Sequence, residues 1–104
     1  ATTDTGVTPL YMACQEGHTE IVTRLLAKDG IDVNIATTDY GATPLCIACQ
    51  YDRIEIVELL LAHKKIEVNK ARTDNGTTPL YTASEAGHTE IVRLLLSHDG
   101  IEVK

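Results

Sequence analysis

Hydrophobic residues return along the chain in a pattern that predicts one amphipathic helix in every 35 residues. In the first period, Ile21, Val22, Leu25 and Leu26 stand at positions i, i+1, i+4 and i+5. This spacing gathers the four side chains on one broad face, which is typical of a helix packed on both sides. The same four residue types return at 56–61 and at 91–96, so we expect three equivalent helices.

A shorter helix is predicted before each of these, because a Thr-Pro-Leu motif begins at Thr8, Thr43 and Thr78. A threonine hydroxyl at the N-cap position accepts a hydrogen bond from an amide of the first turn. Proline suits the first helical position, where its missing N–H costs nothing. In the middle period the motif predicts a short helix from Pro44 to Tyr51.

Turn-forming residues separate and follow the two helices of each period. A Gly-His pair is expected to end the first helix, and the threonine after it to cap the second, at Gly17, His18, Thr19, Gly87, His88 and Thr89. Asp29-Gly30 and Asp99-Gly100 are expected to end the second helix, with glycine in the left-handed conformation. Alternation over 31–34 and a polar turn at 37–41 then predict a hairpin-like arm.

The pattern divides the chain into three units, residues 1–35, 36–70 and 71–104, and fifteen positions are identical in all three. A period of 20–50 residues indicates supersecondary units that stack, because one unit cannot bury its apolar face alone. We therefore predict a single mainly α domain over residues 1–104. It would be a solenoid of three helix-loop-helix units joined by hairpin-like arms.

The repeated motifs resemble those of the ankyrin repeat, and the resemblance covers the whole chain. The matching features are the Gly-x-Thr-Pro-Leu block, the Gly-His pairs, the Glu-Ile-Val run, the paired leucines, and the Val-Asn pairs at 33–34 and 68–69. The resemblance implies an ankyrin-repeat solenoid that serves as a non-enzymatic protein-protein interaction module. It also implies that the turn histidines His18 and His88 cap and hydrogen-bond locally.

The chain departs from the ankyrin pattern at several positions. Its period is 35 residues, whereas the ankyrin unit has about 33. The histidine that follows Thr-Pro-Leu in the family is Tyr11, Cys46 and Tyr81 here. Unit two has Asp52-Arg53 where a Gly-His pair is expected, so we predict that its turn between helices is the least regular of the three.

Composition narrows the class of partner and the compartment. Nine basic and 15 acidic residues give a net charge of −6, and the charges are interleaved, so no nucleic-acid partner is expected. No apolar stretch reaches the length of a membrane span, and no signal-peptide pattern is recognised. Three cysteines, an odd number, favour a reducing compartment. We expect an intracellular protein, cytoplasmic or nuclear.

The sequence offers little support for catalysis or metal binding. The pair Cys46 and Cys49 imitates a redox motif near a helix N-terminus. The same repeat positions hold tyrosine, cysteine or serine in the other units, which indicates core packing instead. Histidines lie about one repeat apart in their columns, so they are not expected to converge on zinc. We predict no enzymatic activity, no cofactor and no metal.

Partner binding is expected on the concave face of the solenoid, which the resemblance places at the arm tips and the first helices. Positions that differ between units are the best candidates, because packing does not fix them. Tyr40, Ile47 and Tyr51 are the expected hot spot, since tyrosine is enriched at interfaces. The full candidate set is Thr5, Val7, Met12, Gln15, Glu16, Tyr40, Ala42, Ile47, Gln50, Tyr51, Asn75, Thr77, Thr82, Glu85 and Ala86.

Two other interpretations remain open. Units one and three keep apolar residues where terminal repeats normally carry polar ones. The chain also begins without Met and stops at Lys104, before a further arm. It could therefore be an interior piece of a longer array with a structural or spacer role, whose uncapped ends stack copies end to end. An engineered repeat scaffold is the third interpretation, which the three cysteines and the limited number of invariant positions disfavour.

Overall fold

The computed structural model describes residues 7–103, and within them the chain forms six α-helices and no β-strand. The predicted mainly α class is confirmed. The helices are α1 (Pro9–Glu16), α2 (Thr19–Leu26), α3 (Pro44–Gln50), α4 (Ile54–Ala62), α5 (Pro79–Ala86) and α6 (Thr89–Leu96).

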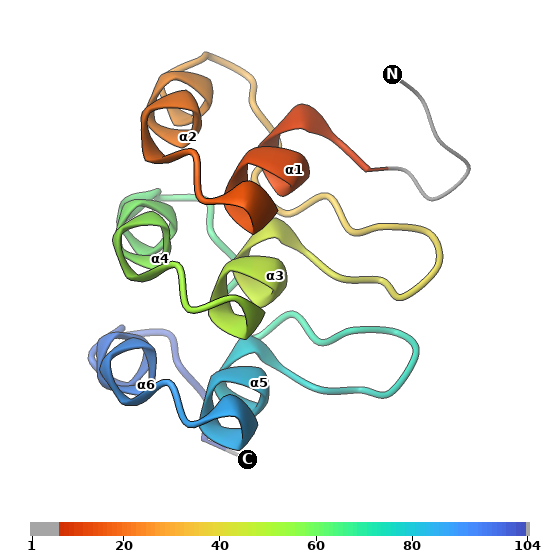
Figure 1. Cartoon of the computed structure of the whole chain (residues 1–104), viewed down its shortest axis with the longest axis vertical. Helices are drawn as coiled ribbons and strands as arrows, with labels where there is room; N and C mark the ends of the chain where they lie inside the picture. Colours follow the sequence, from red (N-terminus) through yellow and green to blue (C-terminus); the bar gives the residue numbers. More distant parts are fainter. Residues whose placement is uncertain (1–6, 104) are drawn as a thin grey trace.

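Three helix pairs stack on one another to form two layers (Figure 1). The inner layer contains α1, α3 and α5, and each of these packs against the next. The outer layer contains α2, α4 and α6, which pack in the same order. Between the pairs the chain runs out on the inner side as long loops, arm two (residues 36–43) and arm three (residues 71–78). This is the predicted stack of helix-loop-helix units joined by arms.

The inner helices begin as predicted. Thr8, Thr43 and Thr78 are in extended N-cap conformations, and each hydroxyl accepts a hydrogen bond of 3.2 Å from the amide three residues on. The predicted caps of the outer helices are wrong. Thr19 and Thr89 are already the first helical residues, and the histidines before them make no side-chain capping bond. A residue in helical conformation cannot direct its hydroxyl back to the first-turn amides as an N-cap does.

The Asp-Gly pairs do not end the outer helices directly. Helix α2 ends at Leu26 and α6 at Leu96, three residues before each pair begins. Gly30 has a left-handed φ of 81°, as expected, whereas Gly100 has not. The Asp-Gly pair therefore does not end the outer helix, and its glycine lies in the loop that follows.

The turn between helices in unit two follows the same backbone path as the other two. In each unit the backbone amide of the residue after the glycine position donates a hydrogen bond to the carbonyl five residues earlier, at 2.9–3.0 Å. The donors are His18, Arg53 and His88. Asp52 stands at the glycine position and takes a φ of 60°, the one left-handed non-glycine residue among residues 7–103. Helix α3 also ends one residue earlier than its equivalents. The predicted irregularity is limited to these two features.

The hydrophobic core is deepest in unit two, which has a neighbour on both sides. Leu45, Ile56 and Leu60 are fully buried, and so are Ile91 and Leu95 of unit three. Burial of these repeated leucines and isoleucines is the main contribution to stability. The invariant positions of the repeat thus account for the stacking.

Polar side chains join successive units at the exits of the outer helices. The side-chain nitrogen of Asn34 donates a hydrogen bond to the Lys65 carbonyl at 2.8 Å. Its side-chain oxygen accepts one from the backbone amide of Glu67 at 2.9 Å. Asn69 makes the same pair of bonds to Gly100 and Glu102, at 2.7 and 2.9 Å. A carboxamide can do this because it carries both a donor and an acceptor.

A second type of cross-unit bond starts from the turns between helices. A ring nitrogen of His88 lies 2.8 Å from the carbonyl oxygen of Cys49 in the preceding unit. Arg53, at the equivalent position, donates twice to the Gln15 carbonyl, at 3.1 and 2.7 Å. The expected local role of the turn histidine is therefore wrong for His88, which bonds between units. Arg53 performs the same task with different chemistry.

Candidate protein-binding surface

The inner helices and the two described arms form one continuous side of the molecule, called the arm face below (Figure 1). Most candidate residues lie there, because they belong to α1, α3, α5 or the arms. Met12, Glu16, Gln50 and Tyr51 are exposed. Val7 and Gln15 are half-buried. Thr5 lies outside the described residues.

A shallow hollow of about 340 Å³ opens on the arm face between units two and three. Its lining comes from α3, α5 and arm three. Six of its seven residues are candidates from the variable positions, and the seventh is Arg72. The lining residues are Gln50, Arg72, Asn75, Thr77, Thr82, Glu85 and Ala86. The variable positions of unit three, together with Gln50 of unit two, thus lie side by side around one hollow.

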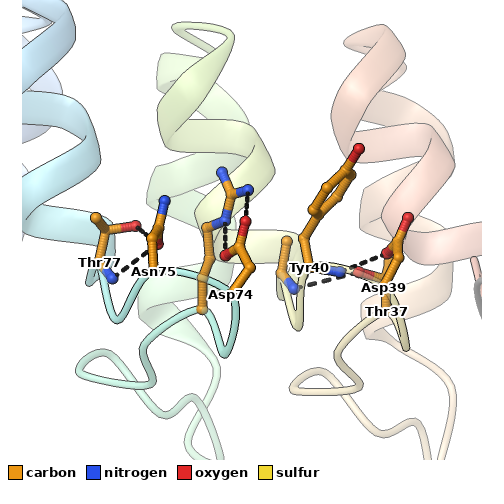
Figure 2. A network of polar contacts seen from close by, with 8 residues as sticks. Thr37, Asp39, Tyr40, Asp74, Asn75 and Thr77 are labelled. Carbon is orange, nitrogen blue, oxygen red and sulfur yellow. Dashed lines mark hydrogen bonds and ion pairs between the residues drawn. The ribbon is translucent and has the colours of Figure 1, made fainter.

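Arg72 is the residue that sequence reasoning missed. Its guanidinium makes two hydrogen bonds to the Asp74 carboxylate, at 3.0 and 2.7 Å (Figure 2). The hydrogen bonds from Arg72 lower the pKa of the Asp74 carboxyl, and the same pairing raises the pKa of Arg72. Residues 2 and 37 at the same repeat position are threonine. The position therefore varies between units, and that signal could have identified it.

Arg72 also joins arm three to arm two. Its guanidinium carbon lies 5.2 Å from the centre of the Tyr40 ring, within the range of a cation–π contact. The Tyr40 carbonyl accepts hydrogen bonds from the amides of Thr73 and Asp74, at 3.0 and 3.2 Å. Figure 2 shows Tyr40 and Asp74 on neighbouring arms. The exposed Tyr40 ring is therefore held in place before any partner binds.

Asn75 and Thr77 shape the arm-three side of the hollow. The Asn75 side-chain oxygen accepts from both the amide and the hydroxyl of Thr77, at 3.0 and 2.9 Å (Figure 2). This leaves the Asn75 side-chain nitrogen without a bond inside the described part of the chain. Glu85 is exposed on α5 and is unpaired among residues 7–103. The hollow therefore presents both a hydrogen-bond donor and a negative charge.

A family model for ankyrin repeats matches the chain in three copies, over residues 1–72 and 36–104. The chain belongs to the ankyrin-repeat family. No curated protein matches it. Ankyrin repeats are in general protein-protein interaction modules rather than enzymes.

Two candidate residues of this ankyrin-repeat chain are not on the surface. Ile47 is 6% exposed, because α3 lies between α1 and α5, whereas Met12 at the same position of unit one is 45% exposed. Ala42 is 4% exposed, and its amide and carbonyl both bond to Thr37 across the base of arm two. Both are candidates because their residue types differ between the units. Buried positions can also hold different residues in different units, so this difference does not require exposure.

The expected hot spot therefore does not form as one cluster. Tyr40 and Tyr51 are both exposed, but helix α3 separates them along the chain. Tyr51 lies against Arg53, with the guanidinium carbon 5.9 Å from its ring centre, on the side of the turns between helices. Tyr40 and Arg72 lie on the arm side. One tyrosine therefore precedes α3 on arm two, and the other follows α3 at the turn between helices.

The cysteines are part of the ankyrin core. Cys14, Cys46 and Cys49 are all buried and free. Burial raises the pKa of the Cys14 thiol to about 12 and raises that of Cys49 as well, with a smaller contribution from Cys46. Thiols that stay protonated are poor nucleophiles. Among residues 7–103, no three His, Cys, Asp or Glu side chains are grouped for a metal ion, and no helix is long and apolar enough to cross a membrane.

Proposed function

We propose that this chain binds a protein partner inside the cell, through the arm face and centred on the hollow between units two and three. The observation that supports this is that six of the candidate variable positions line one hollow on the arm face. The invariant positions are used for stacking, so the variable ones are free to differ with the partner.

The chemistry of the hollow favours a protruding polar segment of the partner. The Gln50 and Asn75 amides, the Thr82 hydroxyl and the Glu85 carboxylate surround it. Such groups accept a loop that offers backbone amides or a basic side chain. Arg72 is already paired with Asp74, so it contributes shape and rigidity rather than an unpaired charge.

The rim of the hollow is preorganised on the arm side. Tyr40 is held by the Arg72 guanidinium and by backbone bonds between the arms. An aromatic residue that is already fixed loses little conformational entropy on binding. Tyrosine also contributes more binding energy than most residues at interfaces. We therefore infer that Tyr40 contacts the partner next to the hollow.

The test is affinity capture from the cells of origin, followed by titration of the purified captured protein against variants. Asn75→Ala with Glu85→Ala removes the Asn75 side-chain nitrogen and the Glu85 carboxylate from the hollow, together with the two bonds that Asn75 accepts from Thr77. We expect the dissociation constant to rise at least tenfold, the size typical of lost interface hydrogen bonds with a charge. Tyr40→Ala with Tyr51→Ala tests the two exposed tyrosines of unit two in the same way.

The matched control lies on the opposite layer of the molecule. Glu58→Ala with Ser97→Ala changes exposed residues of α4 and the loop after α6, and it should leave the affinity unchanged. If this control variant lost as much affinity as the Asn75 and Glu85 variant, the arm face would be disproved as the binding site. Unchanged affinity of the Asn75 and Glu85 variant would disprove the hollow as its centre.

A structural role within a larger ankyrin assembly is the second candidate function. It is supported by the apolar side chains that stay exposed at both ends of the stack, Ile21 in unit one and Leu96 in unit three. In this role the chain would act as a spacer whose end faces contact further ankyrin units.

A further inference from the structure

Arm three carries an Asn-Gly pair, Asn75-Gly76, and the sequence contains no other. In such a pair the backbone nitrogen of the glycine can attack the side-chain amide carbon of the asparagine, because glycine has no Cβ to obstruct the approach. Both residues are exposed, and nothing lies within 4 Å of a Cβ built on Gly76. The reacting groups are therefore accessible to water and to base.

The hydrogen bonds of the Asn75 side chain favour this attack. Its oxygen accepts from both the amide and the hydroxyl of Thr77, at 3.0 and 2.9 Å (Figure 2). Two donors on that oxygen stabilise the negative charge that develops there when the carbon is attacked. The side-chain nitrogen makes no hydrogen bond within residues 7–103, so no bond holds it back from leaving as ammonia.

The two other asparagines of the chain are held differently. Asn34 and Asn69 each donate from the side-chain nitrogen and accept on the side-chain oxygen, in bonds to the next unit. An isoleucine and a lysine follow them, so the next backbone nitrogen is obstructed by a Cβ in both cases. Arm two has a tyrosine at the position of Asn75 and no side-chain amide to react. The reactive arrangement is specific to arm three.

We propose that Asn75 is a site of spontaneous deamidation, with water as the co-reactant. Base removes the proton of the Gly76 amide, and the nitrogen forms a bond to Cγ of Asn75. The bond from Cγ to the side-chain nitrogen breaks, and this nitrogen takes up a proton and leaves as ammonia, which closes a succinimide ring. Water then opens the ring, and attack at Cγ gives aspartate, whereas attack at the main-chain carbonyl gives isoaspartate. No atom is oxidised or reduced.

A hydrogen bond within arm three controls how often the reaction begins. The Gly76 amide donates to the Arg72 carbonyl at 2.9 Å, and the Arg72 amide donates to the Thr77 carbonyl at 2.8 Å. The Gly76 nitrogen is protected from base while it makes this bond, so local opening must come first. The Arg72 side chain is fixed in turn by Asp74 and by the Tyr40 ring. Opening of arm three therefore sets the rate of deamidation.

The product changes the hollow on the arm face, which Asn75 and Glu85 both line. Deamidation replaces the side-chain nitrogen of Asn75, a hydrogen-bond donor, with a carboxylate oxygen, which only accepts. The hollow then carries two carboxylates and has lost this donor. The modification itself needs no partner, so the inference does not depend on the proposed function.

The test is incubation of the full chain at neutral pH and physiological temperature. Peptide mapping by mass spectrometry follows the change from amide to acid, and an isoaspartyl methyltransferase detects isoaspartate. We expect conversion at Asn75 and none at Asn34 or Asn69, with a rate that rises with hydroxide concentration. Gly76→Ala should slow the reaction at least about tenfold, because its Cβ obstructs the attack. An unmodified Asn75, or equal conversion at all three asparagines, overturns the proposal.

Arg72→Ala tests the control by the arm. It leaves the reacting groups unchanged but removes the guanidinium that fixes arm three, so deamidation should become about tenfold faster. Arg93→Ala is the matched control, because it removes an arginine whose ion pair with Glu90 lies on α6, away from the arms. The two variants are compared while circular dichroism shows both folded. An unchanged rate in Arg72→Ala, or the same acceleration in Arg93→Ala, overturns the control by arm opening.

Discussion

The interface between units one and two and the interface between units two and three share their apolar positions and their asparagine bonds, but they differ in the polar bond made from the turn between helices. In the first, the Arg53 guanidinium crosses Gly17 and donates twice to the Gln15 carbonyl. In the second, the smaller His88 ring makes a single contact with the Cys49 carbonyl. The backbone of both turns is the same. Stacking of the helices therefore sets the backbone of the turn, and both an arginine and a histidine side chain reach a carbonyl of the preceding unit from it.

The largest effect is expected at Gly41, which affects only the interface between units two and three. Gly41 has a φ of 67°, and a Cβ there would lie 2.7 Å from the Thr73 amide nitrogen and closer still to the Thr73 side chain. Gly41→Ala should lower the free energy of unfolding by about 2–3 kcal/mol, through backbone strain and loss of the contact between arms. Urea denaturation measures the change.

Gly76→Ala is the matched control, because Gly76 occupies the same position one unit later. Its φ is 72°, but nothing lies within 4 Å of an added Cβ. The cost should therefore be the backbone strain alone, about 1 kcal/mol. Equal costs for the two substitutions would show that the approach of the two arms contributes nothing to stability.

The next effect compares the two cross-unit bonds directly. Arg53→Ala removes two charged hydrogen bonds and should destabilise by about 2 kcal/mol, whereas His88→Ala removes one and should cost about 1 kcal/mol. Thermal or urea unfolding of the two variants gives the difference. Arg53→Lys should recover only part of the loss, because one ammonium cannot reproduce the two donors of the guanidinium. If His88→Ala cost more than Arg53→Ala, this account of the bonds would be wrong.

The sequence allowed prediction of features that depend on neighbouring residues. The start of each inner helix followed from Thr-Pro-Leu, because the cap and the capped amide are three residues apart. The roles of Arg53 and Arg72 did not follow, since their contacts join residues more than thirty positions apart or on neighbouring arms. The sequence predicted Ile47 on the surface because its residue type differs between the repeats, as it does at many exposed positions. Only the packing of α3 between α1 and α5 shows that Ile47 varies although it is buried.

The smallest effect concerns the residue that differs most between the two turns. Asp52 has a left-handed φ of 60°, and Gly87, at the equivalent position of unit three, has a left-handed φ of 77°. Asp52→Gly should relieve this strain and stabilise by about 0.5 kcal/mol, after the added flexibility of glycine in the unfolded chain is subtracted. Gly87→Asp should destabilise by a similar amount, because nothing lies within 4 Å of its Cβ. Equal and opposite changes in urea midpoint would indicate that the two turns are one structure. A loss of stability in both variants would instead show that the Asp52 side chain has a role in the unit-two turn that the backbone does not require.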